Sequence, residues 1–133
     1  MGINIRQLKD DEYPEMLKLM YRVFPKANVK LSDRDSIIVA DMQGEVVGFV
    51  HYASYHRKAV IKGFGVEGNA RGIGIGTNLI NQVLQRFEKI GKPVYLKVKQ
   101  LNPAVNIYAK FGFTMAKIEE EKGTYMLVRR LNN

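Results

Sequence analysis

The stretch from Val60 to Asn78, VIKGFGVEGNARGIGIGTN, constrains this chain most strongly, because a β-rich run passes through a glycine-rich turn directly into a helical pattern. Three glycines, Gly72, Gly74 and Gly76, alternate where that helix is expected to begin. The first N–H groups of a helix have no partner within it, and the helix dipole makes that end partly positive. Without Cβ atoms in the way, such a junction is typical of a phosphate or pyrophosphate site.

Three kinds of glycine-rich phosphate loop can be compared with this stretch. A nucleotide P-loop needs Gly-Lys-Ser/Thr at its end, but Thr77 and Asn78 follow Gly76 here. A dinucleotide-binding loop needs a different glycine spacing and an acid about 20 residues further on, and the region near Val94 has none. The third kind, Arg/Gln-x-x-Gly-x-Gly/Ala after a strand, fits at every fixed position from Arg71 onward. A plain glycine-rich linker would not be followed at once by an amphipathic helix.

Composition narrows the class of protein. With 133 residues we expect one domain spanning 1–133, and an apolar content of 46% is enough for a core. The absence of cysteine excludes disulfides and thiolate sites, and with only His51 and His56 we expect no metal centre. No run of 18 or more apolar residues and no signal-peptide pattern is present, so we expect a cytoplasmic protein. The net charge of +8 favours an anionic partner, whether nucleic acid, membrane or an anionic cofactor such as coenzyme A.

The residue patterns predict an α/β fold, a mixed sheet packed by helices, in the order β-α-β-β-β-α-β-α-β-β. Asp10 and Asp11 are expected to cap the first helix, and Gly91 to end the second. Side chains on the core face of the first helix are expected to be Met16, Leu17, Met20, Val23 and Phe24, and on that of the second Ile75, Leu79, Val83, Phe87 and Ile90. The expected strands are Ile3–Leu8, Ser36–Met42, Glu45–Tyr55, Ala59–Val66, Val94–Lys99, Phe113–Glu119 and Thr124–Leu131, with a short helix from Asn102 and Pro103 to Lys110.

A second motif follows the glycine turn by about thirty residues: NPAVNIYAKFGF, from Asn102 to Phe113, with Tyr108 at its centre. With the element order and the Arg-x-x-Gly-x-Gly turn, it makes the whole chain resemble the GCN5-related N-acetyltransferases (GNAT). The resemblance implies a mostly antiparallel GNAT-type sheet in which the strands at 59–66 and 94–99 splay apart. It also implies acetyl-coenzyme A as co-substrate, no metal, and direct acetyl transfer to a primary amine in a ternary complex.

The resemblance assigns the cofactor site residue by residue. The amides of the glycine turn and the Arg71 side chain would hold the pyrophosphate. The backbone around Gly65 would pair with the pantetheine arm like an added strand, and one amide there would polarise the thioester carbonyl. The cofactor-binding residues expected are Phe64, Gly65, Val66, Arg71, Gly72, Ile73, Gly74, Ile75, Gly76 and Asn102.

Tyr108 would be the general acid, because a phenol with a pKa near 10 can give a proton to the leaving thiolate. Without the motif around it, Tyr108 would be interpreted as a helix tyrosine packed on the core. Asn102 lies six residues before Tyr108, whereas the family commonly has an asparagine seven before, where Leu101 stands here. Asn102 therefore either contacts the cofactor or only caps a helix.

No general base can be assigned from the sequence. Many family members have a glutamate on the strand before the glycine loop or on the next strand, but 59–66 and 94–100 contain lysines and no acid. Glu67 follows the strand and is an ordinary turn residue unless it orients a water. His51 is the residue type that titrates near neutral pH. A water chain, or an amine already partly neutral, would also serve.

The acceptor is expected to be a small-molecule or peptide amine, with no nucleic acid and no membrane as partner. A homodimer is common among relatives, but nothing in the sequence decides it. By resemblance, the amine enters between the first helix with its loop, the hairpin at 45–55 and the last two strands. Acids that could attract it, or be ordinary loop charges, are Asp33, Asp35, Glu119, Glu120 and Glu121, and tyrosines that could line the pocket are Tyr52, Tyr55 and Tyr125.

Two rival functions remain at this stage. KGFGV, from Lys62 to Val66, imitates the start of an RNA-recognition motif, but it departs from that motif at the fifth place and again at Asn69. The first strand also lacks the stacking ring that such a module needs. A non-catalytic acyl-coenzyme A sensor of the same fold is the other rival, because no carboxylate base is evident.

Overall fold

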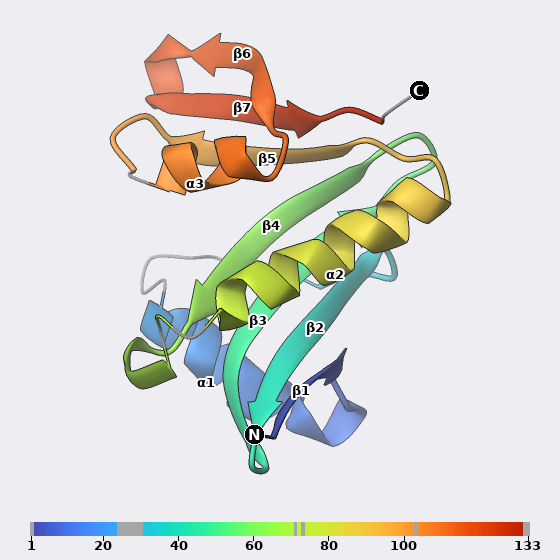
Figure 1. The fold of residues 1–133 in the computed structure, drawn as a ribbon, viewed down its shortest axis with the longest axis vertical. Coiled ribbons are helices and arrows are strands. Elements are labelled where there is room, and N and C mark those ends of the chain that lie inside the picture. The colour runs from blue at the N-terminus through green and yellow to red at the C-terminus, as the bar shows by residue number, and fades with distance from the viewer. Residues whose placement is uncertain (1, 24–30, 71, 73, 103, 132–133) are drawn as a thin grey trace.

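A seven-stranded sheet with helices on both faces forms the fold (Figure 1). The computed structural model describes residues 2–23, 31–70, 72, 74–102 and 104–131. The strand order is β1-β2-β3-β4-β5-β7-β6, and neighbouring strands are antiparallel except for β4 and β5. The strands are β1 (Ile3–Gln7), β2 (Asp35–Met42), β3 (Glu45–Ser54), β4 (Ala59–Val66), β5 (Val94–Lys99), β6 (Thr114–Glu119) and β7 (Thr124–Arg129). The helices are α1 (Tyr13–Val23), α2 (Ile75–Lys89) and α3 (Ala104–Lys110), with 3-10 turns η1 (Asp10–Glu12), η2 (Gly68–Ala70) and η3 (Glu120–Lys122).

The element order and the mixed, mostly antiparallel sheet confirm the predicted fold class. The prediction was wrong at the start of the first helix. Asp10 and Asp11 do not cap α1 but lie inside η1, whose N-cap is Lys9. The Glu12 carboxylate closes this turn by accepting a hydrogen bond from the Lys9 amide (2.8 Å), so α1 begins only at Tyr13.

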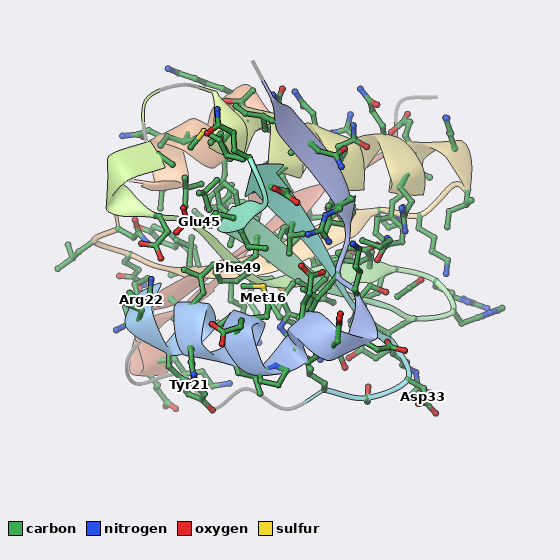
Figure 2. The ribbon with its side chains drawn as sticks, turned by 90° about the horizontal axis from the view of Figure 1, so that it is seen from below. Met16, Tyr21, Arg22, Asp33, Glu45 and Phe49 are labelled. Carbon is green, nitrogen blue, oxygen red and sulfur yellow. The ribbon has the colours of Figure 1, made fainter. Side chains whose placement is uncertain are left out.

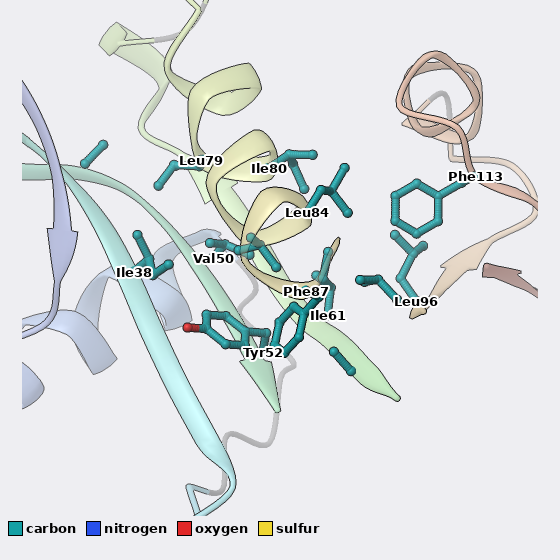
Figure 3. Close-up of a cluster of buried hydrophobic side chains, with 14 of the residues drawn as sticks. Ile38, Val50, Tyr52, Ile61, Leu79, Ile80, Leu84, Phe87, Leu96 and Phe113 are labelled. Carbon is teal, nitrogen blue, oxygen red and sulfur yellow. The ribbon is translucent and has the colours of Figure 1, made fainter. Parts of the chain in front are cut away.

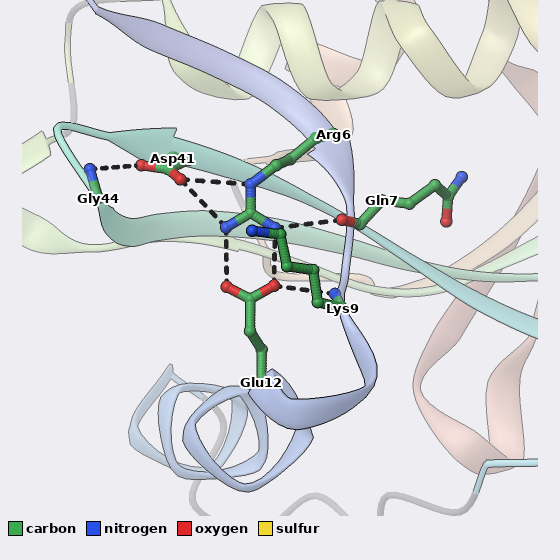
Figure 4. Close-up of polar contacts among 6 residues, drawn as sticks. All are labelled: Arg6, Gln7, Lys9, Glu12, Asp41 and Gly44. Atoms are coloured by element: carbon green, nitrogen blue, oxygen red, sulfur yellow. Dashed lines mark hydrogen bonds and ion pairs between the residues drawn. The ribbon is translucent and has the colours of Figure 1, made fainter.

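Arg6 joins this turn to the sheet (Figure 4). Its guanidinium donates to both Glu12 oxygens at 2.7 Å and to the Asp41 carboxylate at 3.0 and 3.2 Å. The hydrogen bonds from Arg6 and from the Lys9 amide lower the pKa of Glu12 to about 2. Because Arg6 is in β1 and Asp41 in β2, the cluster holds the start of α1 against this edge of the sheet.

The larger core lies between α2 and the sheet (Figure 3). Its helix side chains recur at helical spacing and are buried as predicted, with one exception: Ile90 follows the end of α2 and is exposed. Phe87 packs edge-on against Tyr52 of β3, with ring centroids 5.5 Å apart. The buried side chains of α2 are Ile75, Leu79, Ile80, Val83, Leu84 and Phe87.

A smaller core lies between α1 and the opposite face of the sheet. Met16 points from α1 toward Phe49 of β3 (Figure 2). Leu19 occupies a buried position, whereas Leu17, which we predicted on this face, is only half-buried. The side chain of Val23, and Phe24 altogether, lie outside the described residues. Packing in the two cores determines which side chains of β2, β3 and β4 point toward each face of the sheet.

The parallel pair β4 and β5 is joined over three residue pairs only. Ala59, Val60 and Ile61 pair with the first three residues of β5, and the two strands then diverge (Figure 1). β4 continues for five more residues, to Val66, paired with β3. The splayed strands predicted from the family resemblance are therefore present.

Candidate functional site

The glycine turn leads from η2 into α2. Gly72 and Gly74 have φ angles of +86° and +83°, in the left-handed region that glycine adopts without steric cost. Gly74 is the N-cap of α2, and its carbonyl accepts a hydrogen bond from the Asn78 amide (3.0 Å). No side chain in the described part of the chain caps this helix end, which is the arrangement that suits an anion. Arg71 and Ile73, both predicted to bind the cofactor, lie outside the described residues.

Gly76 serves a different purpose from the two glycines before it. A Cβ at Gly76 would lie 3.1 Å from Cζ of Phe64, whereas a Cβ at Gly72 or Gly74 would meet nothing within 4 Å. The missing side chain therefore lets the first turn of α2 lie directly against β4. Ile75 anchors the same turn with a side chain that is buried in the main core. The two conformational glycines and the packing glycine together place the uncapped helix end beside β4.

From Lys62 to Gly65, β4 has no neighbouring strand on its β5 side among the described residues, although β5 itself is fully described. An open edge offers alternate N–H and C=O groups to an extended ligand. Beyond Val66 the chain passes through η2 to the glycine turn. The predicted pantetheine-binding residues Phe64 and Gly65 lie on this edge, paired on their other side with Val50 and Phe49, and the third, Val66, ends β4 and pairs with Gly48.

Tyr108 projects from α3 and packs against the main core. Its ring is half-buried and meets Phe113 edge-on, with centroids 5.8 Å apart. The Tyr108 carbonyl accepts hydrogen bonds from the Phe111 and Phe113 amides, which end the helix. Burial raises the pKa of the Tyr108 phenol. A phenol that stays protonated is suited to giving up a proton late in a reaction.

Asn102 lies two residues before the first residue of α3, Ala104. Its carbonyl accepts a hydrogen bond from the Val105 amide (3.1 Å), and its own amide donates to the Lys99 carbonyl (3.0 Å). This backbone arrangement is that of a residue at a helix start. Pro103 lies outside the described residues. A contact between Asn102 and the cofactor stays a prediction.

Several side chains that the sequence suggested for the site form contacts with other parts of the protein instead. Glu67, considered as a water-orienting group, forms an ion pair with Arg22 of α1. Tyr52 is buried in the main core and accepts a hydrogen bond from Arg86 (2.8 Å), so it does not line an open pocket. Tyr55 lies under the Arg34 guanidinium at 5.5 Å. Because of these contacts, Glu67 is not a candidate for orienting a water and Tyr52 is not a candidate for lining the amine pocket.

A buried polar cluster that we did not predict joins β2, β3 and β4. Asp35 Oδ1 lies 2.7 Å from His51 Nε2 and 3.1 Å from Lys62 Nζ. Asp35 Oδ2 accepts hydrogen bonds from the Ser32 amide (2.8 Å) and hydroxyl (2.6 Å). The Asp35 side chain is 2% exposed, so the interpretation as an ordinary loop charge was wrong. Burial acts to raise the pKa of Asp35, but the hydrogen bonds from Ser32, His51 and Lys62 outweigh it and hold the pKa well below its usual range.

The remaining predicted acids are Asp33, in the turn before β2, and three residues at the end of β6 and in η3. Glu119 is paired with Lys97 (3.4 Å) and Lys122 (3.6 Å) and accepts a hydrogen bond from Thr124 (3.1 Å). Burial acts to raise the pKa of Glu119, and the Thr124 and Lys97 hydrogen bonds outweigh it, so the net pKa is lowered. The other acids are exposed: Asp33, Glu120 and Glu121.

Other features of the described residues lie away from this site. A surface hollow of about 520 Å³ lies between α2 and α3, lined by residues such as Leu84, Glu88 and Arg129 and by none of the predicted site residues. Within the described ranges, no group of three or more histidine, cysteine or acidic side chains is placed to hold a metal ion. No helix among those residues is long and apolar enough to cross a membrane.

Comparison with known families matches residues 8–128 to the family described as Acetyltransferase (GNAT) domain. The chain belongs to the GNAT acetyltransferase family. This confirms the resemblance seen in the sequence, and it accounts for the splay of β4 and β5 beside the glycine turn of this GNAT domain.

One curated relative of this GNAT chain is an N-alpha-acetyltransferase of Sulfolobus acidocaldarius. The two are 36% identical over 95 residues, and the match covers 60% of this chain and 56% of the relative. The GNAT chain thus spans little more than half the length of that relative.

Solved structures of the same fold include the ribosomal-protein-S18-alanine N-acetyltransferase of Escherichia coli. It has a TM-score of 0.83 and 16% identity, with 99% of this GNAT chain and 97% of the other chain covered. Arabidopsis thaliana Naa50, in complex with the bisubstrate analogue CoA-Ac-MVNAL, has a TM-score of 0.77 and 25% identity, with 96% and 97% covered. Both overlays extend over nearly the full length of the GNAT chain.

Proposed function

We propose that this chain is an acetyl-coenzyme A-dependent N-acetyltransferase whose acceptor is the primary amine at the N-terminus of a peptide or protein. The observation that carries the proposal is the edge of β4 from Lys62 to Gly65, which has no neighbouring strand toward β5, followed in the chain by the uncapped start of α2. Membership of the GNAT family supports acetyl transfer. The relative named N-alpha-acetyltransferase, and a similar fold solved with a peptide-bearing coenzyme A analogue, support the choice of acceptor.

In this proposal, backbone groups make the main contacts with the cofactor. When bound, acetyl-coenzyme A supplies the acetyl thioester. The amides of the first turn of α2 hold the diphosphate by hydrogen bonds and by the positive end of the helix dipole. The backbone of Phe64, Gly65 and Val66 pairs with the amide groups of the pantetheine arm. Arg71 and Ile73 are proposed to complete the phosphate site, and Asn102 to contact the cofactor from the start of α3.

The same edge takes part in the chemistry. A β4 amide donates a hydrogen bond to the thioester oxygen, which becomes negative when the amine nitrogen attacks the carbonyl carbon. The C–N bond forms, the C–S bond breaks, and the Tyr108 hydroxyl gives its proton to the sulfur. The proton that the nitrogen loses on becoming an amide returns to the Tyr108 oxygen by way of solvent. The raised pKa of Tyr108 keeps that proton in place until the thiolate develops.

Cofactor binding and transfer can be tested separately. Acetyl-coenzyme A is expected to raise the melting temperature, and mass spectrometry is expected to find one acetyl group on the α-amine of unblocked peptides. Short RNA is expected to leave the melting temperature unchanged. A rise with RNA and none with the cofactor would contradict the proposal.

The non-catalytic sensor predicts a different pattern. Tight cofactor binding without thiol release, across a wide panel of peptides and small amines, would favour the sensor, since β4 and β5 carry no carboxylate. A single-domain organisation over 1–133, a cytoplasmic location, the absence of nucleic-acid and membrane partners, and a homodimer stay predictions.

A further inference from the structure

Burial of the Asp35–His51–Lys62 cluster costs desolvation free energy, and the cluster includes none of the proposed cofactor-binding residues. It lies on the α1 face of the sheet, next to the apolar cluster of Ile37 and Phe49. The His51 side chain is 6% exposed and Lys62 is 35% exposed, so the cluster reaches the surface through Lys62. Buried charges carry a desolvation cost, and perturbed ionisable groups gather at functional sites.

The hydrogen bonds of the cluster define the state of the His51 ring. Asp35 is held ionised by the Ser32 and Lys62 donors, so its Oδ1 acts as an acceptor toward His51 Nε2. In the neutral ring, Nε2 then carries the hydrogen and Nδ1 carries the lone pair. Such a ring accepts a proton at Nδ1 and forms an imidazolium paired with a carboxylate already in place.

A single glycine separates His51 from the reacting edge. His51 pairs with Gly63 of β4, where the register shifts, so the strands bulge at this point. A Cβ at Gly63 would lie 3.8 Å from His51 Cβ and 3.5 Å from Phe49 Cε2, so the missing side chain leaves room for one methyl group beside His51. Neighbouring strands lie about 4.8 Å apart, and β4 is the edge strand here.

The cofactor geometry proposed above brings the thioester to the same place. A ligand anchored after Val66 and laid along β4 can extend only as far as Ile61, where β5 closes the edge. Its reactive end therefore lies beside residues 62–64, level with Gly63.

We infer that His51 Nδ1, with Asp35 behind Nε2, accepts the proton that the acceptor ammonium loses before attack, through a water held over Gly63. This inference rests on the proposed function. The ammonium N–H bond breaks and the proton passes by way of the water to Nδ1, which leaves a neutral amine to attack. The imidazolium then returns the proton to solvent, while Tyr108 protonates the leaving sulfur. The titratable groups around His51 are Asp35 of β2, which it contacts, Lys62 of β4, which contacts Asp35, Tyr55, which interacts with Lys62, and Tyr13 of α1 on the same face.

The two histidines of the chain provide a matched pair of variants. His51→Gln is expected to lower kcat/KM by about 10²–10³ at pH 7, the usual loss of a general base. In this variant, the rising limb of the pH–rate profile that comes from the enzyme is expected to disappear. The dissociation constant of coenzyme A is expected to stay unchanged. His56→Gln changes an exposed turn residue and is expected to leave the profile as in the wild type. Peptides whose amines differ in basicity show where the rising limb comes from. A limb that comes from the enzyme stays at the same pH for every peptide, whereas a limb that comes from the acceptor amine shifts with the basicity of that amine.

Two further measurements cover the case in which His51→Gln does not fold. Gly63→Ala places a methyl group at ordinary contact distance on a glycine without positive φ, and is expected to lower kcat/KM with the coenzyme A affinity retained. Nitrogen-15 NMR of labelled histidine in the native protein is expected to show the hydrogen of the neutral His51 ring on Nε2 and none on Nδ1. A retained limb in His51→Gln, full activity in Gly63→Ala, or a neutral ring with its hydrogen on Nδ1 would each overturn the inference. If wild-type protein acetylates no amine, it is the proposed function that fails instead.

Discussion

At the scale of single residues, the proposed chemistry depends on Tyr108 keeping its proton at neutral pH. The ring is held between the core and Phe113, and this burial is what raises its pKa. A phenylalanine at this position keeps the ring contacts and removes the proton, so it separates the chemical role from the packing role.

Tyr108→Phe is expected to lower kcat by about 10²–10³ with little change in melting temperature or in cofactor affinity. In the wild type, the raised pKa places the loss of the phenol proton above the usual value of about 10, so activity is expected to fall only at alkaline pH. The check is kcat against pH for both proteins. An unchanged kcat in the variant would remove Tyr108 from the mechanism.

The glycines of the turn differ in what they tolerate. Gly76→Ala is expected to lower the free energy of unfolding by about 1–3 kcal/mol, because its Cβ meets Phe64 at 3.1 Å and must push α2 away from β4. Coenzyme A affinity is expected to fall with it. Gly68→Ala, which meets nothing within 4 Å and has no positive φ, is the control. Chemical denaturation and calorimetric titration measure both effects, and equal values for the two variants would contradict this account.

At the scale of elements, Arg6 connects β1, β2 and the turn that starts α1. The ion pair with Glu12 uses two parallel hydrogen bonds, a geometry stronger than a single contact between exposed charges. By contrast, the Glu15–Lys18 pair on the outer face of α1 is largely exposed to solvent, with side chains 80% and 70% exposed. Only the first pair is expected to contribute measurably to stability.

Glu12→Gln is expected to lower the free energy of unfolding at pH 7 by roughly 1–2 kcal/mol, somewhat less than a fully buried hydrogen bond to a charged group, because the pair is partly exposed. The folded pKa of Glu12 lies below its usual value, from 4.5 to about 2, so this contribution is present above pH 4.5 and is lost as the pH falls toward 2. Denaturant unfolding at pH 7, 4 and 2.5, with Glu15→Gln as control, follows the difference. A gap between wild type and Glu12→Gln that does not depend on pH would show that the charge is not its origin.

At the scale of the whole molecule, the formal charge of +8 surrounds a site proposed to take an anionic cofactor. Long-range attraction of this kind speeds encounter and is screened over about 10 Å at 0.1 M salt. The backbone contacts at α2 and β4 are short-ranged and are screened much less.

We therefore expect the KM for acetyl-coenzyme A to rise several-fold between about 0.05 and 0.5 M NaCl, while kcat changes little. Steady-state kinetics at saturating acceptor provide the measurement, with sucrose at matched osmolarity as control. A KM that is independent of salt would mean that the net charge has no part in cofactor capture.

Much of this protein follows from local pattern alone. The strand, glycine turn and helix at 60–78, and the element order, depend on residues at most a few positions apart, and the structure confirms that order. The family match was evident from the same turn together with the motif around Tyr108.

Tertiary structure decided what local pattern could not. The edge of β4 from Lys62 to Gly65 has no neighbouring strand toward β5 among the described residues because β5 pairs with only three residues of β4, and the packing role of Gly76 exists because α2 lies on Phe64. His51 and Lys62 are 16 and 27 residues from Asp35 in the sequence, and they meet it only through strand register and a bulge. Register is set by the packing of both faces of the sheet, and no window of sequence contains that information.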